Sequence, residues 1–171
     1  MAGAVASRVR EFAARRACAR LAMAALGVKS GAELAPIGVA ADRTPEWPTG
    51  FGGSITHSGT HWAAAVFRRG QGILSIGIDL EPAEPLDSDL LPEVCRAEEA
   101  AWLMRQSASH RLLLARAIFS AKESAYKCQY SASRQALEFA DVGIDLFLDR
   151  DAFVATLLRG AGDFPRNAHW W

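Results

Sequence analysis

Two kinds of hydrophobic spacing occur along the chain, and together they predict a mixture of helices and short strands. Apolar residues recur at three- and four-residue steps in three segments, which predicts helices over 7–26, 94–106 and from near 109 to 127. Alternating or continuous apolar runs predict strands over 61–67, 73–80, 142–148 and 153–158. We expect Ser7 to be the N-cap of the first helix and Gly27 to end it.

Proline- and glycine-rich or polar stretches separate these elements and predict loops over 31–53, 82–92 and 129–138. The first loop contains Arg43 and Trp47 in one turn. This turn is either a surface corner that packs its own tryptophan or a ledge for a flat, charged ligand. The tail after Gly160 has no clear pattern, but the paired tryptophans at its end predict that it docks onto the body of the protein.

Composition excludes several classes of function. The 171 residues are 50% hydrophobic and 22% charged with a formal net charge of zero, so no overall field favours nucleic acid or an anionic membrane. No apolar run approaches the length of a membrane span. The three cysteines are odd in number, lie far apart and lack metal-ligand spacing, which predicts reduced thiols in a cytoplasmic protein.

Two segments in the first half of the chain carry groups suited to an anion. The first helix is rich in arginine, including Arg16 and Arg20, and is either a solvated basic face or a contact for a polyanionic ligand. His57 lies among Ser54, Thr56 and Ser58. A lone histidine is more often structural, but the flanking hydroxyl groups offer hydrogen bonds that suit a phosphate.

Acidic residues in the second half suggest a cation. Asp79 and Glu81 fall on one face of the predicted strand, about 7 Å apart, where they repel each other unless a cation lies between them. Water at a strand end is the alternative explanation. Glu123 and Lys127 are four residues apart on one helix face, with Lys122 beside them. Taken alone, that helix pattern is more typical of a solvated ion pair than of a site.

The order of these motifs resembles a known family. Gly77 to Glu81 (G-I-D-L-E), followed about forty residues later by Phe119 to Lys127 (F-S-A-K-E-S-A-Y-K), resembles the paired signature of the 4′-phosphopantetheinyl transferases. Those signatures read G-x-D-x-E and W/F-x-x-K-E-(A/S)-x-x-K. Trp47-Pro48 with the G-S-I-T-H-S stretch and the Arg16-x-Cys-Ala-Arg helix are similar to the larger, monomeric branch, which serves siderophore, nonribosomal-peptide and polyketide synthases. The resemblance covers about residues 10–158.

The resemblance implies an α+β fold of two pseudo-symmetric halves, each a small antiparallel sheet packed on a helix, with the active site between them. Residues 1–72 would form the N-terminal half, on the 3′-phosphate and adenine side of the cofactor, and 73–171 the half with the metal and catalytic motifs. The implied reaction transfers the phosphopantetheine arm of coenzyme A to a serine of an apo acyl, peptidyl or aryl carrier protein and releases 3′,5′-ADP. The implied protein is a cytoplasmic monomer.

The resemblance also implies a role for each candidate residue. Three carboxylates would hold Mg²⁺, a cation that accepts hard oxygen ligands and neutralises phosphate: Asp79, Glu81 and Glu123. Lys122 and Lys127 are expected on phosphate oxygens. Glu123 is the first candidate to accept the serine proton, directly or through water, and Lys127 is the second. The 3′-phosphate and adenine end would contact Arg16, Arg20, Arg43, Thr56 and His57.

Some features depart from the family pattern and keep other hypotheses open. The family's leading segment is expected to be short or absent, a further strand is expected where the chain ends, and Phe119 replaces a more usual tryptophan. A nucleotidyltransferase or phosphatase also uses a strand D-x-E motif, but the expected upstream Gly-Ser pair or further strand acid is not found. A protein that only binds coenzyme A or a carrier protein is the non-enzymatic alternative.

Overall fold

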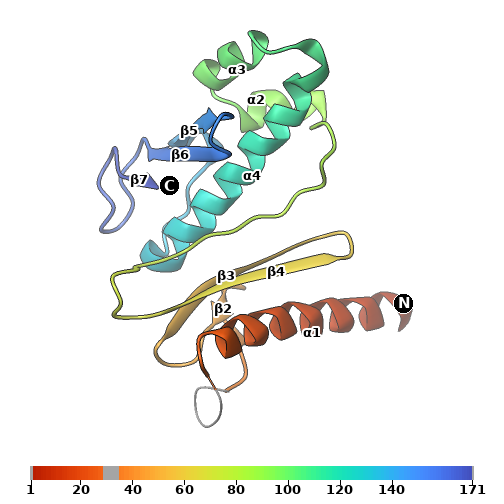
Figure 1. Cartoon of the computed structure of the whole chain (residues 1–171), viewed down its shortest axis with the longest axis vertical. Coiled ribbons are helices and arrows are strands. Elements are labelled where there is room, and N and C mark those ends of the chain that lie inside the picture. The colour runs from red at the N-terminus through yellow and green to blue at the C-terminus, as the bar shows by residue number, and fades with distance from the viewer. Residues whose placement is uncertain (1, 29–34, 171) are drawn as a thin grey trace. The chain divides into compact units, whose positions relative to one another are not determined.

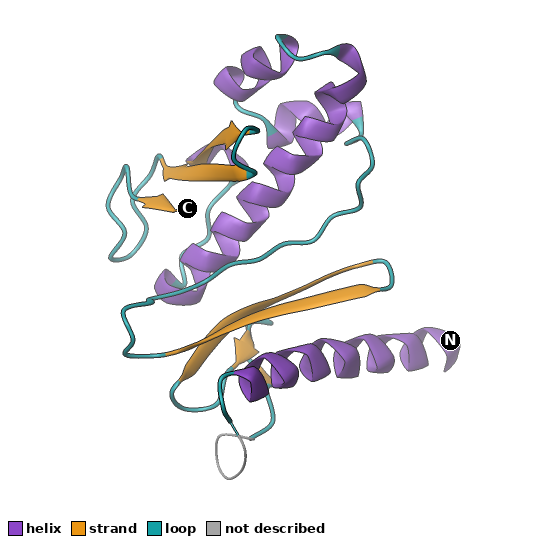
Figure 2. Cartoon of the chain, viewed as in Figure 1, coloured by secondary structure: helices purple, strands orange, loops and turns teal. Residues whose placement is uncertain are grey.

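A computed structural model describes residues 2–28 and 35–170, and their side chains from residue 10 onward. The chain divides into two compact units, Met1–Leu80 and Glu81–Trp171. Helices and small antiparallel sheets occur in both (Figure 2), which confirms the predicted α+β class. Within the described residues, no helix combines the length and the hydrophobicity that crossing a bilayer requires.

The first unit is built on a long helix and a hairpin. Its elements are α1 (Ala2–Ala25), β1 (Gly38–Val39), β2 (Pro45–Glu46), β3 (Phe51–Ser58) and β4 (His61–Arg68). Strands β3 and β4 pair antiparallel with Ile55 opposite Ala64, and α1 lies along this hairpin (Figure 1). The core between them contains Ala19, Met23 and Phe51, each at most 1% exposed.

Trp47 packs against this core, as one of the two alternatives for its turn predicts. Its ring lies against Gly53, where an added Cβ would come within 2.8 Å of the indole and also collide with the Ala65 carbonyl oxygen. Only a glycine allows that close approach. Arg43 lies on the surface of the same turn with a φ of 67°.

The second unit is organised around its longest helix. Its elements are η2 (Ser88–Leu90), α2 (Leu91–Val94), α3 (Ala97–Met104), α4 (Ala108–Ser133), η3 (Phe139–Asp141), β5 (Val142–Phe147), β6 (Ala152–Leu157) and β7 (His169–Trp170). The strands form one antiparallel sheet in the order β5-β6-β7. Side chains of α4 pack against α2, α3, β5 and β6 and form the core of this unit (Figure 1).

Several sequence predictions are confirmed. The strands predicted over 61–67, 142–148 and 153–158 form within one residue of the expected ends, whereas β3, the partner of the first, was not predicted, and its start lies in the predicted loop over 31–53. Gly27 follows the first helix with a φ of +85°, a conformation that favours glycine. The tail docks as expected, since Trp170 in β7 packs against the core of the second unit. The last residue of the predicted pair, Trp171, lies outside the described residues.

The predicted strand over 73–80 is wrong. The segment is extended but belongs to no sheet, and residues 75–80 are all half-buried, with no alternation in burial. The Ile78 amide donates to the Ser54 hydroxyl at 3.1 Å, a side-chain partner in place of a neighbouring strand. An alternating sequence predicts which faces a strand would have, but it cannot supply the second strand that a ladder requires.

Three helix boundaries also differ from the predictions. The first helix begins at Ala2 and runs through Ser7, so Ser7 is not its N-cap. The predicted helix over 94–106 is interrupted at Cys95 and Arg96, both extended, because the Glu99 carboxylate accepts the Arg96 amide hydrogen and starts a new helix there. The predicted loop over 129–138 is helical up to Ser133, since residues 128 and 129 continue the buried face of α4.

An ion pair at the start of β5 should make stability depend on pH. Arg159 donates to both oxygens of the Asp141 carboxylate, at 3.0 and 2.8 Å, and this hydrogen bonding lowers the pKa of Asp141. A lowered carboxyl pKa adds stability that is present above the unfolded value of 3.8 and is lost as pH falls through the lower, folded value.

We therefore expect Asp141→Asn to lower the free energy of unfolding at pH 7 by about 1 kcal/mol or less, because the pair is partly exposed. The difference from wild type should shrink as pH falls below 3.8 and vanish once pH is below the lower pKa of the folded state. Urea unfolding between pH 2.5 and 7 measures it. Asp149→Asn, which alters an exposed pair with Arg150, is the control and should have no such effect. A constant difference across that range would contradict the prediction.

Candidate functional site

One face of α4 is buried, and the motif lies at its edge. The buried residues recur at three- and four-residue steps: Ala115, Ile118, Ala121, Lys122, Ala125, Cys128 and Gln129. Lys122 lies seven residues after one member of this stripe and seven before another, so helix geometry directs its side chain into the core. Glu123 and Lys127 follow on the adjacent, half-buried face. The two lysines of the motif therefore have different environments.

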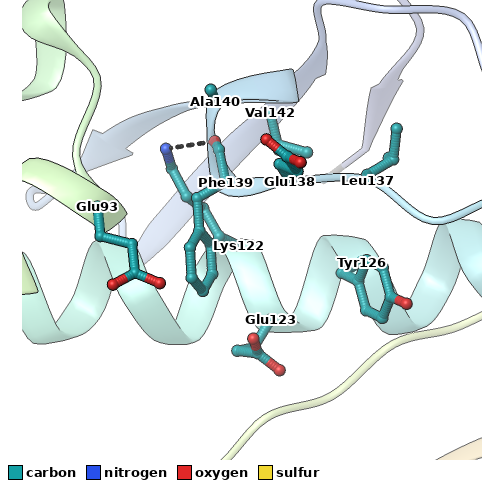
Figure 3. A pocket seen from close by; sticks show the side chains of 9 residues that line it. All are labelled: Glu93, Lys122, Glu123, Tyr126, Leu137, Glu138, Phe139, Ala140 and Val142. Carbon is teal, nitrogen blue, oxygen red and sulfur yellow. Dashed lines mark hydrogen bonds between the residues drawn. The ribbon is translucent and has the colours of Figure 1, made fainter.

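The Lys122 ammonium is 1% exposed and has three oxygen partners. Its Nζ lies 2.8 Å from Glu99 Oε2, and it donates to the carbonyls of Val94 at 2.8 Å and Phe139 at 2.9 Å. Figure 3 shows the contact with Phe139. An ammonium has three N–H donors, so these contacts use all of them. A phosphate contact from Lys122, which remains a prediction, would require it to give up one.

The partner carboxylate is equally well satisfied. Glu99 is 5% exposed and accepts the Arg96 amide at 2.7 Å and the Ile144 amide at 2.8 Å in addition to Lys122. Burial lowers the pKa of Lys122, and the hydrogen bond and charge of Glu99 oppose that shift. Burial, with the nearby Glu99 charge, raises the pKa of the Cys95 thiol to about 11, which leaves it inert.

A cavity of about 440 Å³ opens beside this pair in the second unit. It is lined by Glu93, Lys122, Glu123, Tyr126, Leu137, Glu138, Phe139, Ala140 and Val142 (Figure 3). Lys122 and Glu123 leave α4 in different directions, the lysine toward η3 and the glutamate away from it. Since the Lys122 charge is matched by Glu99, the carboxylates of the lining give this cavity a negative wall.

Glu81 is held against α4 by a residue that the sequence analysis missed. Arg116 Nη1 donates to Glu81 Oε2 at 3.0 Å, and both side chains are about three-quarters or more buried. Arg116 precedes Glu123 by seven residues, so the two lie on one helix face about 10 Å apart. This seven-residue spacing was the sequence signal that could have identified Arg116. The contact leaves Glu81 Oε1 for another ligand.

Asp79 belongs to the first unit and contacts the hairpin. The Thr56 hydroxyl, on a residue 5% exposed, donates to Asp79 Oδ1 at 3.2 Å. His57 is exposed and points to the opposite face of β3, because successive residues of a strand alternate. The structure therefore brings Thr56 together with Asp79, but not with the imidazole that follows it.

Carboxylate oxygens are the ligands that Mg²⁺ prefers, so the chemistry of Asp79, Glu81 and Glu123 fits this ion. Asp79 and Glu81 are two residues apart in the chain, which limits the separation of their Cα atoms to about 7 Å. Asp79 lies in the first unit, and Glu81 and Glu123 lie in the second. Among residues 2–28 and 35–170, no three His, Cys, Asp or Glu side chains form a group that could hold a metal ion.

The three arginines predicted to contact a ligand differ in their surroundings. Arg16 donates to the carbonyls of Ile37 at 3.2 Å and Gly38 at 3.1 Å, and its guanidinium stacks on the Phe12 ring. Burial, with the charge of a neighbouring arginine, lowers its pKa. Arg20 and Arg43 are exposed. Arg16 thus supports the fold of its own unit, whatever else it contacts.

Comparison with protein families gives two successive matches. Residues 1–67 match the 4′-phosphopantetheinyl transferase N-terminal domain, and residues 75–169 match the 4′-phosphopantetheinyl transferase superfamily. The second match includes Asp79, Glu81 and the whole of the α4 motif.

Curated relatives agree with these matches. The chain is 36% identical over 159 residues to the 4′-phosphopantetheinyl transferase Svp of Streptomyces mobaraensis, which is 92% of this chain and 63% of the relative. It is 38% identical over 144 residues to Npt of Nocardia iowensis, which is 84% of this chain and 62% of the relative. It is 36% identical over 149 residues to PptT of Mycobacterium tuberculosis, 87% and 63% respectively. The chain thus spans less than two thirds of the length of these relatives.

The buried pair predicts that replacing Lys122 lowers the free energy of unfolding much more than replacing Lys127. Lys122→Met leaves the Glu99 carboxylate buried without its counter-ion, and removing one partner of such a pair typically costs about 3–5 kcal/mol. Lys127→Met, on the same helix but half-buried, should cost roughly 1 kcal/mol or less. Urea unfolding at pH 7 measures both. Equal losses would show that the Lys122 contacts do not hold this unit together.

Proposed function

Because the chain belongs to the 4′-phosphopantetheinyl transferase superfamily, we propose that it transfers the 4′-phosphopantetheine arm of coenzyme A to a serine of an apo carrier protein. The products are the holo carrier protein and 3′,5′-ADP. The observation that carries the proposal is the position of Glu123, which lines the cavity of the second unit beside the buried Lys122–Glu99 pair. A half-buried carboxylate at an open cavity is suited to accept a proton from a substrate.

In the proposed reaction the serine oxygen attacks the phosphorus that is joined to pantetheine. A new O–P bond forms, the bond within the diphosphate breaks, and 3′,5′-ADP leaves with the electron pair. Glu123 accepts the hydroxyl proton, directly or through a water molecule, and Lys127 is the alternative base if its ammonium is deprotonated. Most of the catalysis of phosphoryl transfer comes from positioning and charge stabilisation. The groups that contact the diphosphate therefore have to position it and stabilise its negative charge.

Asp79, Glu81 and Glu123 are the proposed ligands of a divalent cation. When bound, Mg²⁺ or Mn²⁺ supplies positive charge to the diphosphate oxygens. Two contacts in the separate units support the proposal. Thr56 orients Asp79, and Arg116 orients Glu81 while leaving its second oxygen available.

The basic groups divide between the two ends of coenzyme A in this proposal. Lys127, and Lys122 if it exchanges one of its present partners, contact diphosphate oxygens. The 3′-phosphate and adenine end contacts Arg16, Arg20, Arg43, Thr56 and His57. We also propose that the protein acts as a monomer in the cytoplasm, a reducing compartment that suits the absence of disulfides among its three cysteines.

The proposed activity predicts that the purified chain, incubated with Mg²⁺ and coenzyme A, adds one phosphopantetheine arm to an apo carrier protein. Intact-mass spectrometry of acyl, peptidyl and aryl carriers measures the gain, and a carrier with its serine replaced by alanine is the control. Binding of coenzyme A without a mass gain on any carrier would favour the non-catalytic alternative. Chelation of the divalent ion with EDTA should abolish the gain.

Glu123→Gln should abolish transfer but leave coenzyme A affinity within a few-fold, because the amide cannot accept the serine proton whereas most cofactor contacts are basic. Single-turnover mass spectrometry and calorimetric titration measure the two quantities. Glu93→Gln is a matched control, since Glu93 lines the same cavity and has no role in the proposal. Near-normal turnover of Glu123→Gln would contradict the assignment of the base.

A further inference from the structure

A basic residue outside the motifs contacts the histidine of the first unit. Arg15, in α1, directs its Nη2 at His57 Nε2 over 2.7 Å. Arg15 is also 3.8 Å from Glu11 one turn earlier on the helix. The arginines singled out from the sequence are Arg16 and Arg20, which leave the helix in other directions. The helix thus presents to β3 an arginine that is distinct from these two.

The chemistry of the two groups fixes the state of the imidazole. A guanidinium is always protonated and has only donors, so His57 Nε2 must accept the hydrogen bond with its lone pair. A ring nitrogen that accepts carries no proton, and the neutral ring then carries its proton on Nδ1. The contact therefore selects the Nδ1–H tautomer of the neutral ring.

The surroundings of the pair support a preorganised contact. Trp62 lies opposite His57 across the hairpin, so both side chains are on the same face of the sheet. The backbone of Trp62 accepts from the Cys18 thiol at 3.7 Å, which links the strand to the next turn of α1 beyond Arg15. The Arg15 Nε and the Trp62 Nε1 are buried, so the arginine stem and the indole are packed rather than solvated.

We infer that Arg15 is a positioning residue, which holds His57 as a neutral donor whose Nδ1–H is the one ring group left for a ligand. The inference rests on the proposed function only for the identity of that ligand, an anionic group of coenzyme A. His57 then contributes a hydrogen bond rather than a positive charge. The charge that binds the anion comes from the arginines instead.

The tautomer can be measured without any ligand. Long-range ¹H–¹⁵N spectra of the ¹⁵N-labelled full chain near pH 7.5 distinguish a protonated Nδ1 from a protonated Nε2, and the spectrum of His57→Gln identifies the His57 signals. We expect the Nδ1–H tautomer in wild type and a shift toward Nε2–H in Arg15→Met. A protonated Nε2 in wild type, or an unchanged tautomer in Arg15→Met, would overturn the inference.

A double-mutant cycle tests whether Arg15 acts through His57. Calorimetric titration with coenzyme A should give a three- to tenfold loss of affinity for Arg15→Met in the wild-type background and little further loss in His57→Gln. Arg10→Met, an exposed arginine on the same helix, is the control and should leave the affinity unchanged. Equal losses in both backgrounds would mean that Arg15 contacts the ligand itself, and the positioning role would be wrong. No binding by wild type would refute the proposed function, while the tautomer measurement still decides the inference.

Discussion

The buried ion pair between Lys122 and Glu99 is the interaction on which the second unit depends. Removing two charges from water is costly, and a buried pair is stable only when the remaining donors and acceptors are also satisfied. Here the ammonium has three oxygen partners and the carboxylate has three donors. These partners come from α2, α3, η3 and β5. A single pair between α3 and α4 therefore joins most elements of the unit.

This pair also determines the direction of the side chains that follow it. With Lys122 pointing into the core, the 100° rotation per residue of a helix puts Glu123 at the boundary between core and cavity. Rotating the helix to move Glu123 would separate the Lys122 ammonium from its three oxygen partners, at a cost of several kcal/mol. The direction of the Glu123 carboxylate is thus set by the buried Lys122 ammonium.

The sequence predicts the parts of this structure that depend on local pattern. The helix containing Lys122, the strands β4, β5 and β6 and the glycine stop after α1 all follow from spacing or from one residue type. The predicted strand over 73–80 is wrong because a ladder depends on a partner strand elsewhere in the chain, which a local pattern does not reveal. The burial of Lys122 was missed because charge usually indicates solvent, although Ala115, Lys122 and Gln129 recur at seven-residue steps. Arg15 was missed because nothing in the sequence shows which arginine faces His57.

A sequence motif identifies basic residues but does not distinguish those that stabilise the fold from those that bind a ligand. The structure supplies a criterion, which is the number of donors that a group already directs at protein oxygens. Lys122 uses its whole set, and Arg16 directs two of its nitrogens at backbone carbonyls. Arg15 is a third kind, since it directs one nitrogen at the imidazole of His57. An anion entering this protein would therefore meet charges of three kinds, and only those that retain donors can bind it without breaking a contact of the fold.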